Sequence, residues 1–366
     1  MTSPPPNRPL IGAGDFIAAG LLGEEDRAMA DSVGAAFRLR MSPEMLRAVG
    51  RPGDAVARQF VPAADELTIA ETELTDPIGD LAHSPVRGLT HRYPDRVILQ
   101  VTQTCDVYCR FCFRREAVGD SGALSAEAVR AALDYIRAHP AITEVILTGG
   151  DPLTLSVRRL EALMTGLAAI DHVDVVRFHS RVPVVAPERI TPALIRALEG
   201  RLAVYVVVHT NHAQELTADA CAALARLSRA GIPLLSQSVL LRGVNDSASA
   251  LADLFRALVR NRVKPYYLHH CDLARGTGHF RTTIADGLAL MAALRGRVSG
   301  TALPTYVLDI PGGHGKVPLA SPWLAPGTRP GHWRVTDWQG RTHDYHDPDQ
   351  VAGTISSTST PSLIAV

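Results

Sequence analysis

The sequence predicts an α/β protein whose core is a partial (β/α)6 barrel of TIM-like type, with a helical extension before it and a second extension after it. Short apolar runs alternate with longer segments of helical periodicity from about Val97 onward, which is typical of parallel strands joined by crossover helices. The runs are rich in Val, Ile, Leu and Tyr, as strands buried on both faces tend to be. Six such units are present and a complete barrel needs eight, so we expect an open barrel.

The expected strands are six runs of similar apolar composition. They are RVILQVTQ (96–103), EVILTGG (144–150), VDVVRFHS (173–180), LAVYVVVHT (202–210), PLLSQSVLL (233–241) and KPYYLHHCD (264–272). Functional side chains of parallel α/β folds gather at the carboxyl ends of the strands. The residues that end these runs are therefore the first candidates for a site.

The segments between the strands have apolar residues spaced three and four apart, often with a Ser or Thr cap before them and Gly or Pro after them. The expected helices cover 125–140, 156–170, 191–200, 217–231 and 247–261. A further helix over 285–300 leads to a seventh apolar run, PTYVLDI (304–310).

The remaining chain is assigned to extensions. Residues 1–90 are read as helices and loops packed on the barrel, which itself occupies 91–300. Residues 301–350 contain a glycine-rich loop and the run HWRVTDWQGRTHDYH, which alternates around Gln339-Gly340 like a β-hairpin. The small polar residues 351–366 are expected to form a disordered tail.

The composition argues against several classes of partner. Lys plus Arg and Asp plus Glu each number 37, so no net charge attracts nucleic acid or an anionic membrane surface. We see neither a signal peptide nor an apolar run long enough for a membrane helix. We therefore expect a soluble, cytoplasmic protein with reduced thiols and a small-molecule partner.

Three of the five cysteines form a C-x3-C-x2-C cluster directly after the first strand. Cys105, Cys109 and Cys112 can bind three irons of a cubane cluster and leave the fourth iron without a protein ligand. A structural zinc site would need a fourth ligand at finger-like spacing, and none follows nearby. Cys221 fits the apolar pattern of a helix and is read as a core residue, and Cys271 as a packing residue near the site.

This spacing, with the aromatic Phe111 before the last cysteine, resembles the radical SAM superfamily. The resemblance implies a barrel of the radical SAM type and a [4Fe-4S] cluster whose open iron binds the amino and carboxylate groups of S-adenosylmethionine (SAM), with Phe111 near the adenine. By itself LTGGDPLTL is read as a turn. In this place it resembles the segment that meets the methionine amino group of SAM, which assigns that role to Gly149, Gly150 and Asp151.

A second glycine-rich loop, LDIPGGHGKVPL, places Lys316 behind three glycines. It is not a P-loop, because Ile310 stands where the first Gly should be and Val317 follows the lysine. Alone it would be a tight turn with a solvated lysine. With the cysteine cluster it resembles the lysine 2,3-aminomutase family, in which this lysine binds pyridoxal 5′-phosphate (PLP) covalently. The resemblance extends from DPIGD, beginning at Asp76, to the hairpin.

The resemblance assigns five further residues. Arg92 and Arg96 would hold the PLP phosphate, which suits the guanidinium fork, although alone they could be surface residues. Arg114 would pair with the substrate carboxylate. His209 and Gln237 would line the SAM pocket, although a lone histidine at a strand end is more often a satisfied core residue.

Two acids follow the sixth and seventh apolar runs. Acids at strand ends are often caps, but in the family the residues matching Asp272 and Asp309 bind the distal ammonium of lysine. Two carboxylates favour a cationic side chain over an acidic or apolar one. With Arg114 at the α-carboxylate, they set a separation of about the length of lysine.

The resemblance implies an isomerase that moves the α-amino group of L-lysine from C2 to C3, giving β-lysine. Its cofactors would be a [4Fe-4S] cluster, SAM and PLP, with a flavodoxin- or ferredoxin-like external electron donor. No Cys follows Cys271, so we predict none of the zinc that some members bind between subunits, and a homo-oligomer is left open. His314 replaces a glycine common in the family, with an undetermined effect on the PLP pocket.

Three alternatives are kept. The same chemistry on ornithine or arginine would use the two acids nearly as well. A radical SAM enzyme of another reaction type would lack PLP. A non-catalytic iron–sulfur or zinc scaffold would leave the other correspondences unexplained.

Overall fold

The computed structural model describes residues 7–320, 323–329 and 331–346. The chain divides into two compact units, Met1–Leu319 and Ala320–Val366, and each is described separately. Every residue assigned above to a site lies in the first unit. The expected tail over 351–366 lies outside the described residues.

The first unit is built on a nine-stranded sheet in which strands β1 to β9 lie in sequence order. Strands β2 to β8 are parallel, whereas β1 and β9 pair antiparallel with the two ends of that parallel set. No pairing joins β1 to β9 among the described residues, so the barrel is open, as predicted. The strands are β1 Leu89–Tyr93, β2 Arg96–Thr102, β3 Glu144–Gly149, β4 Val175–Ser180, β5 Ala203–His209, β6 Leu234–Leu240, β7 Val263–His270, β8 Thr305–Asp309 and β9 Lys316–Pro318.

The six predicted strands are β2 to β7, and the seventh apolar run is β8. Strands β1 and β9 were not predicted. Their sequences, LTHRY and KVP, lack the long apolar runs of the central strands, because each lies at an edge of the sheet. Both matter for the site, since they bring Arg92 and Lys316 to the barrel.

Side chains alternate between the two faces of the parallel strands. One face carries a buried row that continues across five neighbouring strands in register: Leu99, Leu147, Phe178, Val206 and Leu234. The opposite face lines the interior of the barrel with polar side chains such as Arg177, His179 and Gln237. The period of two therefore separates the apolar core from the candidate site.

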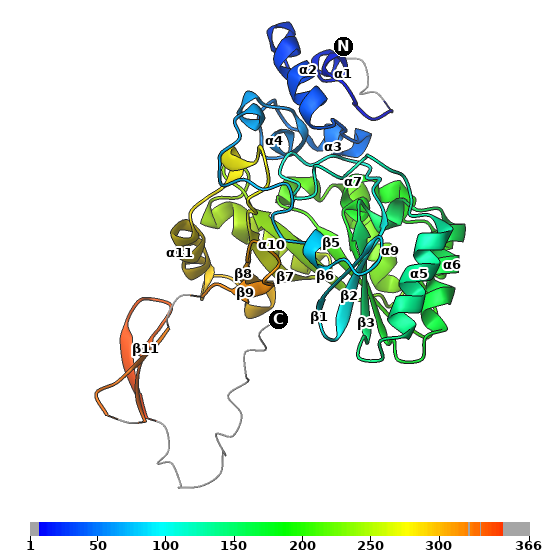
Figure 1. Ribbon diagram of the computed structural model, residues 1–366. Coiled ribbons are helices and arrows are strands. Elements are labelled where there is room, and N and C mark those ends of the chain that lie inside the picture. The colour runs from blue at the N-terminus through cyan, green and yellow to red at the C-terminus, as the bar shows by residue number, and fades with distance from the viewer. Residues whose placement is uncertain (1–6, 321–322, 330, 347–366) are drawn as a thin grey trace. The chain divides into compact units, whose positions relative to one another are not determined.

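All six predicted helices are present. They are α5 Ala126–Arg137, α6 Val157–Ala168, α8 Pro192–Leu198, α9 Ala218–Arg229, α10 Ala248–Arg260 and α11 Ile284–Leu294. Each is capped by the expected kind of residue, since a Ser or Thr hydroxyl accepts from a backbone N–H in the first turn. Figure 1 shows α5 and α6 outside strands β2 and β3.

Short helices precede the barrel, as expected for residues 1–90. They are α1 Ala13–Ala18, α2 Arg27–Ala36, α3 Pro43–Ala48 and α4 Ala57–Phe60, and a fifth short helix, α7 Val182–Val185, follows β4. Phe16, Met45 and Phe60 are fully buried and belong to the main core. The extension is therefore packed on the barrel. No helix in the described part of the chain is long and apolar enough to cross a membrane.

The second unit contains a three-stranded antiparallel sheet of β10 Leu324–Pro326, β11 His332–Thr336 and β12 Thr342–His346. The predicted hairpin is confirmed as β11 and β12. Its turn is stabilised by Asp337, whose carboxylate accepts from the backbone N–H groups of Gln339 and Arg341. Gly340 adopts the positive φ of 83° that this turn requires.

Candidate active site

One cavity of about 980 Å³ runs through the interior of the barrel, and its lining reaches from the first residues of several strands to the loops at their carboxyl ends. All residues assigned from the sequence line it. They are Arg92, Arg96, Cys105, Cys109, Phe111, Cys112, Arg114, Gly149, Gly150, Asp151, His209, Gln237, Asp272, Asp309 and Lys316. The fold thus brings together residues from a span of more than 200 positions, including the cysteine loop and the glycine-rich loop.

The cysteine loop lies between β2 and α5 and is anchored to the N-terminal extension. The carboxylate of Glu66, fully buried, accepts from the guanidinium groups of Arg110 and Arg115, with Arg110 Nε 3.0 Å from both oxygens. The backbone N–H groups of Tyr108 and Arg110 donate to the carbonyls of residues 40 and 59. The loop is therefore held by long-range contacts on both sides of Cys109.

The three cysteines of the loop are free thiols. Burial raises the pKa of Cys112 to about 11 and that of Cys105 well above its usual value, so a bound cationic centre is needed to make them thiolates at neutral pH. In the ranges that the structure describes, no three His, Cys, Asp or Glu side chains surround a single metal-ion position. A [4Fe-4S] cluster distributes its thiolates over separate irons, so three thiols along one cavity wall fit it.

The segment after β3 is tightly packed against the start of the cysteine loop. Gly149 has a φ of 115°, and a Cβ there would lie 2.3 Å from the carbonyl oxygen of Thr102. The buried Asp151 accepts from the N–H groups of Leu153, Arg181 and Val182 and from the hydroxyl of a serine, Ser180. Its carboxylate therefore joins the ends of β3 and β4. Any contact of this segment with a ligand must come mainly from its backbone.

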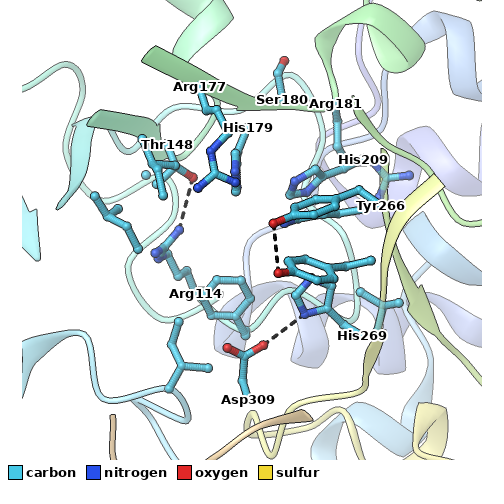
Figure 2. A pocket seen from close by; sticks show the side chains of 18 of the residues that line it. Arg114, Thr148, Arg177, His179, Ser180, Arg181, His209, Tyr266, His269 and Asp309 are labelled. Atoms are coloured by element: carbon cyan, nitrogen blue, oxygen red, sulfur yellow. Dashed lines mark hydrogen bonds and ion pairs between the residues drawn. The ribbon is translucent and has the colours of Figure 1, made fainter. Parts of the chain in front are cut away.

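Three histidines end strands around the cavity (Figure 2): His179 on β4, His209 on β5 and His269 on β7. The Nε2 atom of each is buried and has no hydrogen-bond partner among the described residues. Burial, reinforced by nearby cationic groups, lowers the pKa of His209 to about 3, so the imidazole is neutral. Buried polar atoms without protein partners are costly, which indicates that this wall is built to bind polar ligands.

Lys316 begins β9 opposite Asp309, which ends β8. Its Nζ donates to Asp309 Oδ1 at 2.5 Å, and the other carboxylate oxygen lies 3.0 Å from Nδ1 of His269. Although burial opposes it, these two contacts hold the pKa of Asp309 well below its usual range. Tyr93 of β1 accepts from the backbone N–H of Lys316 at 2.9 Å, so both edge strands fix this lysine.

Asp272 lines the same cavity, and its pKa is shifted in the opposite direction from that of Asp309. Burial, together with the Asp309 carboxylate, raises its pKa to about 7. It has no ion-pair partner among the described residues, whereas Asp309 is paired with Lys316. The two acids therefore differ: Asp309 is neutralised by an ion pair, and Asp272 has none among the described residues.

Two arginines share one acid, Asp80. Arg114 donates to Asp80 Oδ2 at 2.7 Å and to Thr148 Oγ1 at 3.3 Å (Figure 2 shows the latter contact), and Arg92 donates to Asp80 Oδ1 at 3.1 Å. Arg92 Nε is buried and has no hydrogen-bond partner in the described part of the chain. Arg96 is more exposed, lies over the Tyr93 ring at 3.9 Å and pairs with its neighbour Asp95.

The glycine-rich loop packs against residues 76–83. Gly313 and Gly79 have φ values of 87° and 66°, and a Cβ on Gly79 would lie 2.4 Å from the backbone nitrogen of Gly313. His83 Nε2 lies 3.1 Å from the carbonyl oxygen of Gly313. The glycines at these two positions therefore allow two distant segments of the chain to approach closely.

Sequence reasoning did not single out several residues of the site. Asp80 lies in the quoted DPIGD segment, but nothing in the sequence showed that it contacts two arginines. His209 was assigned from the family resemblance; His179 and His269 lie in the second halves of predicted strands, and that position is the only sequence signal that could have found them. Arg181, which follows β4, contacts Cys109 and gave no sequence signal.

A sequence model of the radical SAM superfamily matches residues 99–255, and one described as lysine-2,3-aminomutase matches 291–362. The L-lysine 2,3-aminomutase of Clostridium subterminale is 44% identical over 81% of this chain and 72% of that protein. That of Fusobacterium nucleatum is 41% identical over 80% and 69%.

One further relative and one solved structure are also similar to this chain. The glutamate 2,3-aminomutase of Clostridioides difficile is 36% identical over 90% of this chain and 78% of that protein. A radical SAM methyltransferase structure from Sphaerobacter thermophilus is 18% identical, with a TM-score of 0.43, over 60% of this chain and 68% of the other.

The fold and the cysteine loop define a radical SAM enzyme, which uses SAM and a [4Fe-4S] cluster. More particularly, the chain belongs to the lysine 2,3-aminomutase family and is an isomerase that performs aminomutase chemistry. The predicted family, fold class and enzyme class are confirmed.

Proposed function

We propose that this enzyme converts L-lysine to β-lysine with the help of PLP. The observation that carries the proposal is the presence of Arg114, Asp272, Asp309 and Lys316 in one cavity with the cysteine loop. An amino acid needs a cation for its carboxylate, and lysine also needs acceptors for its distal ammonium. Asp272 without an ion-pair partner and Asp309 supply those acceptors at the far end.

Lys316, Arg92 and Arg96 would hold PLP. The buried, unpartnered Nε of Arg92 and the half-exposed guanidinium of Arg96 are donors suited to a phosphate dianion. When bound, SAM on the reduced cluster supplies a 5′-deoxyadenosyl radical and PLP supplies the aldehyde that carries the substrate nitrogen. The electron would come from an external donor.

The residues of the chain orient the substrate. Arg114 binds the α-carboxylate, and this requires its fork to exchange part of its contact with Asp80. Asp309 neutralises the ammonium of Lys316 in this structure. When Lys316 no longer carries that charge, the same carboxylate is available to the substrate ammonium, next to Asp272. Two acids would repel the side-chain carboxylate of glutamate, which favours lysine over the substrate named for the C. difficile relative.

The test is anaerobic reconstitution with iron, sulfide, PLP, SAM and a reductant, followed by incubation with lysine, ornithine, arginine and glutamate and chiral analysis of the products. We expect β-lysine as the main product. Turnover of ornithine or arginine without lysine would assign another cationic substrate. SAM cleavage without any amino acid product would contradict the aminomutase proposal, and a visible absorption band that is lost in Lys316→Ala reports PLP binding independently of turnover.

A further inference from the structure

One guanidinium contacts the cysteine loop directly. Arg181 Nη1 lies 2.9 Å from Sγ of Cys109, within hydrogen-bond distance. Arg181 is only 8% exposed and immediately follows β4, and Figure 2 shows it well apart from Asp309 in the cavity. It is therefore placed to act on a cluster ligand rather than on the amino acid.

The arginine is fixed by acceptors on its other terminal nitrogen. Nη2 donates to the fully buried carboxylate of Glu215 and, at 3.3 Å, to Oε1 of Gln59. Its backbone N–H donates to Asp151 at 2.7 Å. If the side chain moved away, Glu215 would lose its ion-pair partner in the interior, which is strongly unfavourable.

Aromatic rings complete the setting. The guanidinium carbon lies 5.1 Å from the ring centroid of Phe60 and 5.5 Å from that of Phe111. Rings at these distances contribute cation–π attraction and exclude water. The charge of Arg181 therefore acts on Cys109 through a poorly screened environment, where its effect is larger than it would be at the surface.

We infer that Arg181 is a positioning residue that raises the reduction potential of the iron–sulfur cluster through its hydrogen bond and charge at Cys109. Hydrogen bonds to ligating sulfurs and the local charge are established determinants of cluster potentials. The one-electron reduction adds negative charge to the cluster and its thiolates. A cation on one thiolate stabilises the reduced state more than the oxidised state. Glu215 offsets part of this effect, but it lies on Nη2 while Nη1 faces the sulfur.

The inference depends on the cluster alone and not on PLP or on the substrate. Its test therefore uses reconstituted holoprotein with neither SAM nor amino acid added. The readout is the midpoint potential, measured by anaerobic redox titration with electron paramagnetic resonance of the reduced cluster. An unchanged midpoint potential would not affect the proposed aminomutase reaction. Absence of that reaction would likewise not affect this inference.

The variants are Arg181→Met, which removes charge and donor, and Arg181→Lys, which keeps the charge but cannot reach both Cys109 and Glu215. For Arg181→Met we expect at least a tenfold fall in the ratio of reduced to oxidised cluster at a fixed potential, which is about 59 mV for a one-electron couple. Arg181→Lys should lie between Arg181→Met and the parent.

The matched control is Arg189→Met. Arg189 pairs with Asp106, next to Cys105, but its side chain is 39% exposed. The Arg189→Met substitution removes the same charge near the same loop, but Arg189 has no contact with a cysteine sulfur and solvent screens its charge. We expect a clearly smaller shift. Equal shifts of the midpoint potential in Arg181→Met and Arg189→Met would show that only the loss of net charge matters, and would overturn the inference.

Two other outcomes would also overturn it. An unchanged potential in Arg181→Met, with weaker SAM binding in equilibrium titration, would make Arg181 a SAM ligand instead. If neither variant assembles a cluster, resonance Raman spectra of the parent in ¹H₂O and ²H₂O decide: iron–thiolate bands that do not move on exchange would show that no N–H donates to a ligating sulfur.

Discussion

At the scale of single residues, the two acids of the cavity show how the environment gives two aspartates different pKa values. Asp309 is ionised because Lys316 and His269 contact it, whereas Asp272 is buried close to that negative charge and forms no ion pair with a described residue. A substrate ammonium is the missing partner in our proposal. Of the two acids, Asp272 is thus the one whose charge changes with pH near neutrality.

The raised pKa of Asp272, about 7, predicts a pH dependence for substrate capture. Only the carboxylate binds an ammonium well, so kcat/KM for lysine should fall about tenfold per pH unit as pH decreases below 7, because kcat/KM reports the ionisation of the free enzyme. Asp272→Asn should lower kcat/KM about 10- to 100-fold at pH 8 and abolish this slope. A slope that persists in the variant would assign the titration to another group.

At the scale of structural elements, the cysteine loop obtains its shape from the N-terminal extension. Its arginines reach Glu66, and its backbone reaches residues 40 and 59. The loop has little secondary structure of its own. The extension therefore acts as a clamp on the loop that binds the cluster.

Glu66→Gln should weaken this clamp, because two buried guanidinium groups lose their shared counter-charge. We expect a loss of roughly 3–5 kcal/mol in the free energy of unfolding, measured by urea denaturation, together with lower iron and sulfide content after reconstitution. The control is Glu24→Gln, which breaks an exposed pair with Arg27 and should change neither quantity measurably. Full cluster content in Glu66→Gln would show that the loop keeps its shape without the clamp.

At the scale of the whole molecule, the site depends on segments that are distant in the sequence. Gly79, before the barrel, meets Gly313, beyond its last crossover, with almost no space between their backbones. Asp80 and His83 extend the same contact towards the arginines and the glycine-rich loop. These contacts set where Lys316 can lie.

Two glycine substitutions distinguish the stability cost of backbone strain from the cost of disturbing this contact. Gly79→Ala and Gly53→Ala both place a Cβ at positive φ, 66° and 74°, but the added atom meets Gly313 in the first case and open space in the second. Strain alone costs roughly 1–2 kcal/mol in both. Gly79→Ala should be clearly less stable in thermal unfolding and should bind PLP more weakly in a spectroscopic titration. Equal effects of the two substitutions would show that the contact is dispensable.

Much of this protein's architecture follows from local sequence patterns. The order of strands and helices follows from hydrophobic periodicity and capping residues, which act over a few positions, and the C-x3-C-x2-C spacing is likewise local. His209, Asp272 and Asp309 stand at or near the ends of predicted strands, their assignment to the site came from the family resemblance, and the structure places all three in one cavity.

Which charged groups neutralise one another depends on long-range contacts and not on local sequence. Asp80 between two arginines, Glu66 beneath the cysteine loop and Arg181 on Cys109 each join residues separated by at least 12 positions and often by many more. The edge strands β1 and β9 also depend on pairing rather than on their own apolar character. Such contacts leave no local pattern, because a buried charge is stabilised by whatever partner the fold brings to it.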